Sequence, residues 1–153
     1  MSNINLGRVI LGGIVAGIVI DVFEGLLNGV VLANQWATVM TGLGKSSTMS
    51  IKQILAFNVW GLVAGILMVW IYASMRPRLG AGPKTAICAG LVIWATAYML
   101  GGAAPVFLHL FPVGLMATGL AVGLVETMVA GVAGAYFYKE NAVELPKSSA
   151  MRA

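Results

Sequence analysis

The sequence alternates between four long apolar stretches and short polar connections. The apolar stretches cover residues 7–32, 51–73, 85–102 and 115–138. Each has close to, or more than, the roughly 20 residues with which an α-helix crosses the hydrocarbon core of a bilayer. The pattern therefore predicts an all-α integral membrane protein, a four-transmembrane-helix bundle that forms a single domain over residues 1–138.

The first stretch is predicted to be a retained helix rather than a cleaved signal peptide. Asp21 and Glu24 interrupt it, and apolar residues continue past any plausible cleavage position. After the fourth stretch the chain becomes polar, so residues 139–153 are predicted to form a short cytoplasmic tail.

The positive charges are distributed unevenly between the two predicted sides of the membrane. Four crossings return the chain to its starting side, and that side carries seven Lys and Arg residues against two on the other. Because cytoplasmic loops are enriched in Lys and Arg, we expect both termini to be cytoplasmic, in the inner membrane of a bacterium. The first group is Arg8, Arg76, Arg78, Lys84, Lys139, Lys147 and Arg152, and the second is Lys45 and Lys52.

Composition removes several classes of protein. Residues of the AVILMFWYC set make up 59% of the chain and charged residues 9%, against roughly 45–50% and about 25% in soluble domains. The expected partner is therefore the lipid bilayer, and the scattered positive charges give no basic stripe for nucleic acid. A single Cys88 cannot form an internal disulfide, and a single His109 cannot form a bis-histidine haem site.

The sequence gives little support for catalysis. It contains no G-x-S-x-G, H-E-x-x-H, phosphate-loop or dinucleotide-binding motif, and no motif that identifies a cofactor. His109 is the one weak candidate for a metal ligand, because it lies in an apolar connection between two prolines.

Small residues recur four positions apart within the predicted helices, which places them on one face and allows close approach of helix backbones. Such contacts form inside a bundle, between copies in a homo-oligomer, or with another membrane protein, and the spacing does not choose among the three. The expected helix-packing residues are Gly13, Gly17, Gly25, Gly61, Gly65, Gly119 and Gly123.

Acidic residues within the predicted helices are the most informative feature. At 100° per residue, Asp21, Glu24 and Asn28 share a stripe with small residues in the first helix, while Glu126 in the fourth and Asn58 in the second have similar surroundings. These five side chains should therefore point into the bundle. Glu24 and Asn58 both fall about 7 Å outward of their helix midpoints, which would allow them to meet.

Two functions remain open at this stage. Intramembrane ionisable residues commonly mark ion or proton pathways, which favours a small cation- or proton-linked transporter or channel. The alternative is a non-catalytic accessory or scaffold subunit, in which the acids are protonated or hydrogen-bonded contacts between helices.

A glutamate in the first of four membrane helices resembles the arrangement in small four-helix drug exporters. The long outer loop, the clustered Asp21 and Glu24, and the second membrane acid Glu126 all depart from that pattern. We therefore assign the chain to no family.

Overall fold

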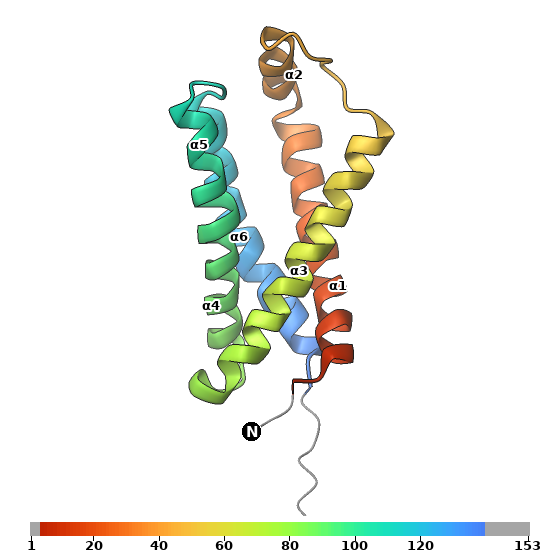
Figure 1. Cartoon of the computed structure of the whole chain (residues 1–153), viewed down its shortest axis with the longest axis vertical. Helices are drawn as coiled ribbons and strands as arrows, with labels where there is room; N and C mark the ends of the chain where they lie inside the picture. Colours follow the sequence, from red (N-terminus) through yellow and green to blue (C-terminus); the bar gives the residue numbers. More distant parts are fainter. Residues whose placement is uncertain (1–3, 140–153) are drawn as a thin grey trace, which may run out of the picture.

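The computed structural model describes residues 4–139, and this part of the chain is helical without strands. Four spans run alternately up and down the molecule (Figure 1). They are Leu6–Val31, Ile51–Leu79, Pro83–Phe107 and Val113–Phe137, each long and apolar enough to cross a membrane. The predicted fold class, a four-transmembrane-helix bundle, is confirmed, and its four apolar spans indicate a multi-pass membrane protein. Residues 140–153, which include most of the predicted tail, lie outside the described residues.

The first span consists of α1 (Leu6–Leu26) and a π-helical turn, η1 (Leu27–Val31). Asn5 caps α1 by accepting a hydrogen bond of 3.1 Å from the backbone N–H of Arg8. A short helix, α2 (Ala33–Gly42), follows at the opposite end of the bundle (Figure 1). The sequence pattern suggested only a loop there, because ten residues are too few to reveal an amphipathic period clearly.

The second span is one helix, α3 (Ile51–Leu79), which begins at a capping box formed by Ser50 and Gln53. It is longer than the predicted 51–73, because the helix continues past Pro77 in its last turn. Gly80 and Gly82 then make the turn with φ angles of 81° and 134°, a region that favours glycine.

The third span is built from three helical pieces, α4 (Pro83–Ile93), the π-helical η2 (Trp94–Leu100) and α5 (Gly101–Phe107). It therefore extends beyond the predicted end at residue 102. The fourth span, α6 (Val113–Phe137), is continuous. We call the end where α1 begins and α6 stops the termini end, and the end with α2 and α5 the distal end (Figure 1).

Small residues bring the helices together in the half of the bundle near the termini end. A Cβ added at Gly65 on α3 would overlap backbone atoms of Gly13 and Gly17 on α1, and one added at Gly90 on α4 would overlap the carbonyl oxygen of Thr127. Larger side chains such as Met68 and Val69 fill the remaining space and are fully buried. Backbone contact through glycine therefore provides the close packing that the spacing predicted.

The distal half is less tightly packed. Every residue from 51 to 60 is exposed, since this part of α3 diverges from the other helices (Figure 1). Gly25 and Gly119 have no neighbour within 4 Å of an added Cβ in the described part of the chain, so these two glycines make no close contact inside this bundle. A smaller apolar cluster of Leu27, Leu32 and Leu115, with Trp36 against it, joins the end of the first span to α6.

Candidate functional site

The hydroxyl of Tyr98 joins two glutamates in the interior of the bundle. It lies 2.8 Å from Oε1 of Glu24 and 2.5 Å from Oε1 of Glu126. Glu24 comes from α1, Tyr98 from η2 and Glu126 from α6, so three of the four spans meet at this point. We call these three residues the carboxyl bridge.

Glu126 is the most deeply buried ionisable residue of the carboxyl bridge, with a relative exposure of 0%. Its second oxygen, Oε2, is buried and has no hydrogen-bond partner within the described residues. A buried polar atom without a partner costs free energy and is uncommon in native proteins. Glu126 therefore has one oxygen fixed by Tyr98 and one that remains open to a further donor.

The other oxygen of Glu24 is held by a second pair of side chains. The amide nitrogen Nδ2 of Asn28 donates to Oε2 of Glu24 at 2.5 Å, and Nε1 of Trp36 donates to Oδ1 of Asn28 at 2.7 Å. The indole N–H is a donor only, so it fixes the carbonyl oxygen of Asn28 toward Trp36 and its NH₂ toward Glu24. Both carboxyl oxygens of Glu24 thus face hydrogen-bond donors.

The two π-helical segments position this network. Asn28 lies in η1 and Tyr98 lies in η2, each directly following a regular α-helix. A π-helical turn adds a residue to the helical repeat and rotates the side chains that follow, and such turns are frequent at functional sites. Gly123 on α6 leaves the space that the ring of Tyr98 occupies.

The carboxyl bridge requires one more hydrogen than the phenol supplies. A hydroxyl carries a single hydrogen, so it donates to one carboxyl oxygen at a time. The contact between the Tyr98 hydroxyl and the other glutamate is then a hydrogen bond only if that carboxyl group carries a hydrogen of its own. Two ionised glutamates beside one tyrosine would leave two negative oxygens on a single donor.

Two members of the predicted polar stripe lie outside this hydrogen-bonded network. Asn58 is exposed on the diverging part of α3, where its side-chain amide donates to the carbonyl oxygen of Ile54 at 2.7 Å. The expected meeting of Glu24 and Asn58 does not occur, because helix depth alone does not report the divergence of α3. Asp21 is half-buried on α1, with Oδ1 directly against Gly61 of α3.

Sequence reasoning did not include Tyr98 or Trp36 among the candidate site residues. A usable signal was the depth of Tyr98 in the third span, about 22 Å from Pro83 at 1.5 Å per residue, which places it between Glu24 and Glu126.

His109, the weak metal candidate, is exposed in the connection between α5 and α6, where its φ is 53°. Within residues 4–139, no group of three or more His, Cys, Asp and Glu side chains is arranged to hold a metal ion. The site is therefore built from carboxyl, phenol and amide groups.

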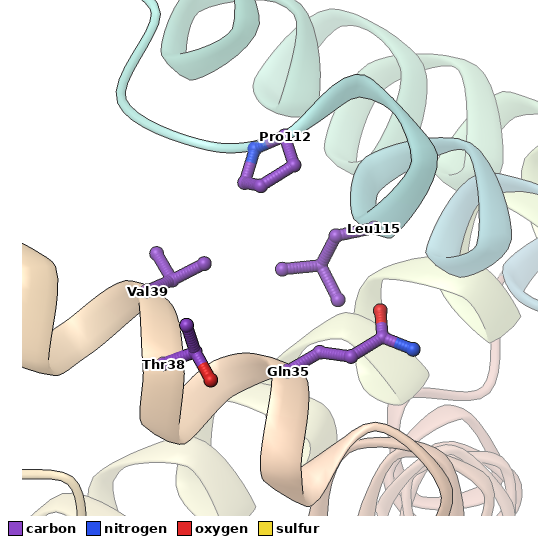
Figure 2. Close-up of a pocket in the computed structure, with 5 residues that line it drawn as sticks. All are labelled: Gln35, Thr38, Val39, Pro112 and Leu115. Carbon is purple, nitrogen blue, oxygen red and sulfur yellow. The ribbon is translucent and has the colours of Figure 1, made fainter.

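An open pocket of about 240 Å³ lies at the distal end, between α2 and the start of α6 (Figure 2). Gln35 and Thr38 supply polar groups, and Val39, Pro112 and Leu115 supply apolar ones. Trp36 follows Gln35 in the chain and packs edge-on against Phe111 at 5.3 Å between ring centroids. The pocket therefore lies beside the tryptophan that begins the hydrogen-bond network.

Comparison of the chain with protein-family models, with curated proteins and with solved structures finds no match.

Proposed function

We propose that this chain is a small cation- or proton-linked membrane transporter or channel in which Glu24 and Glu126 hold the moving charge. The observation that carries the proposal is the carboxyl bridge: two glutamates from different spans share one hydroxyl, and Oε2 of Glu126 is buried without a partner among the described residues. Ionisable residues placed inside a membrane bundle are costly and commonly mark ion or proton pathways. Asp21 and Asn28 contribute charge and orientation beside Glu24, and Asn58 is the least supported member of the predicted set.

The proposed orientation places both termini in the cytoplasm of a bacterium and the distal end outside. Arg8, Arg76, Arg78 and Lys84 belong to the helix ends and turn at the termini end, whereas Lys45 and Lys52 belong to the distal end (Figure 1). This distribution follows the positive-inside rule. Lys147 and Arg152, which the sequence assigns to the same side, lie outside the described residues. Glu24 would then be approached from outside.

The proposal is tested by measuring cation and proton flux in proteoliposomes. Glu24→Gln and Glu126→Gln retain the side-chain shape and hydrogen-bonding groups while removing the charge and the titration. We expect each to lower flux by about 100-fold or more, in line with the loss of a proton-transfer group. Thermal stability should remain close to that of the wild type. Thr118→Val, an exposed position on α6, is the control and should leave flux unchanged.

A second function, an accessory subunit of a membrane complex or homo-oligomer, is favoured by one observation. Gly25 and Gly119 lie on open faces of α1 and α6, where an added Cβ meets nothing within 4 Å in the described chain. If another chain covers these faces, Gly25→Leu and Gly119→Leu should reduce the mass of the detergent-solubilised particle measured by light scattering, whereas Val22→Leu should not. Wild-type flux equal to that of empty liposomes, together with this loss of mass, would favour the accessory role.

A further inference from the structure

The hydrogen-bond donors around Glu24 determine which ion the carboxyl bridge suits. Oε2 faces the NH₂ of Asn28, and Oε1 faces the hydroxyl of Tyr98. Trp36 holds the orientation of Asn28 through its indole N–H, so the amide cannot turn its oxygen toward Glu24 without losing that bond. A metal cation needs acceptor oxygens and would meet N–H hydrogens here. The hydroxyl of Tyr98 can accept as well as donate a hydrogen bond, so a proton on Oε1 of Glu24 has an acceptor beside it.

The second, independent observation is at the other end of the carboxyl bridge. Glu126 is fully buried, and its Oε2 has no hydrogen-bond partner in the described structure. The ionisable groups around Glu126 are Tyr98 of η2 and Glu24 and Asp21 of α1. Oε2 of Glu126 can therefore take up a proton without breaking an existing hydrogen bond within the described residues.

We propose that the ion carried is a proton and that the hydroxyl of Tyr98 relays it between Glu24 and Glu126; this inference rests on the transport function proposed above. In one state, Glu24 donates a hydrogen to the oxygen of Tyr98, and Tyr98 donates its own hydrogen to the carboxylate of Glu126. When both hydrogens shift, the O–H bond of Glu24 breaks as a new O–H bond forms on Tyr98. The original O–H bond of Tyr98 breaks as a new one forms on Glu126, so Tyr98 is again a neutral phenol. The net change is one proton moved, and the total charge of the three groups is unchanged.

The relay covers part of the membrane thickness. Glu24 lies about 27 Å along α1 from Leu6, and Glu126 lies about 16 Å along α6 from Phe137, both counted from the termini end. The backbone positions of the two glutamates therefore differ by about 10 Å in helix depth. Their Oε1 atoms are much closer together, because both contact the hydroxyl of Tyr98, at 2.8 and 2.5 Å. The hydroxyl of Tyr98 is the transfer group between them.

Tyr98→Phe is the direct test, because it removes the hydroxyl while the ring can remain over Gly123. We expect proton flux in proteoliposomes to fall by about 100-fold or more, and wild-type sodium flux to equal that of empty liposomes. Tyr136→Phe removes the hydroxyl of an exposed tyrosine at the termini end and should leave proton flux unchanged. Glu24→Asp is the second variant: it retains the charge but withdraws the carboxyl from Tyr98, so it should also lower proton flux.

Infrared spectroscopy gives a readout that does not depend on flux. The wild-type protein should show the absorption band of a protonated carboxyl group, and Tyr98→Phe should shift this band, whereas Tyr136→Phe should not. Wild-type sodium flux without proton flux would overturn the proton inference and leave the transport function intact. Wild-type proton flux in a folded Tyr98→Phe variant would overturn the relay. Absence of any wild-type flux would contradict the proposed function. If Tyr98→Phe also left the carboxyl band unshifted, proton sharing at the carboxyl bridge would be overturned as well.

Discussion

The phenol ring of Tyr98 lies directly over Gly123, which precedes Glu126 by almost one turn of α6. A Cβ at residue 123 would overlap Cδ1 and lie 2.5 Å from Cε1 of the ring. The absence of a side chain at this position therefore allows the hydroxyl to reach Glu24 and Glu126 together. The contact that packs Gly123 against the ring of Tyr98 therefore also positions the hydroxyl of the carboxyl bridge.

Gly123→Ala should displace the ring of Tyr98 and destabilise the protein by about 1–3 kcal/mol, the cost of adding a methyl group to a filled site. The measurement is thermal unfolding in detergent. Gly119→Ala is the matched control on the same helix, since its added Cβ has no neighbour within 4 Å in the described chain. Equal stability of the two variants would show that the ring does not occupy this position.

Gly65→Ala should be more damaging than Gly123→Ala. Its Cβ would overlap backbone atoms of Gly13 and Gly17, which cannot move away as a side chain can. The substitution forces α1 and α3 apart, so we expect a strong loss of folded protein. The yield of monodisperse protein in detergent measures it, and Gly25→Ala, with open space around it, should give the wild-type yield.

Tyr138→Ala should weaken the termini end. The ring of Tyr138 is 5% exposed and packs edge-on against Tyr72 at 5.9 Å, and the guanidinium group of Arg76 lies over both rings. Loss of a buried aromatic ring costs about 3–5 kcal/mol, and loss of the cation–π contact adds to this. Tyr136→Ala, at a position that is 82% exposed, should change the melting temperature far less.

The proposed orientation can be measured with cysteine labelling. In a Cys88→Ala background, Ser47→Cys should react with an impermeant thiol reagent added to intact cells, because residue 47 lies in the exposed connection between α2 and α3. Arg78→Cys should react only after the membrane is opened. The opposite pattern would reverse the topology and place the approach to Glu24 on the cytoplasmic side.

Much of the fold could be predicted from the sequence because hydrocarbon allows few alternatives. Four apolar stretches in a bilayer must satisfy their backbone hydrogen bonds internally, so they form helices. The predicted helix ends were less accurate. The sequence of residues 75–79 does not distinguish a last helical turn from a loop, and the structure shows that the turn begins at Gly80. The α2 helix was missed because it has only ten residues.

The candidate site could be predicted in part. Glu24, Asn28 and Glu126 were placed on inward faces by a regular 100° repeat, and the structure brings them to one network. Tyr98 was not found, because η2 alters the repeat just before it and because a tyrosine in a membrane helix has no single expected role. Asn58 was expected to face the bundle but is exposed, since the tilt of α3 depends on packing between helices and not on its own sequence.

The glycine-packed part of the bundle between Glu126 and the termini end also determines how proton movement would respond to membrane voltage. About 16 Å of α6 separates Glu126 from Phe137, and small buried residues such as Ala16 and Ala130 fill this layer. A layer packed with small apolar residues has a low dielectric constant, so a membrane voltage would fall mainly across it. Moving one elementary charge through about 100 mV changes its free energy by about 2.3 kcal/mol. A proton that leaves Glu126 toward the termini end would therefore be driven or opposed by voltage, while the step from Glu24 to Glu126 would respond to it much less.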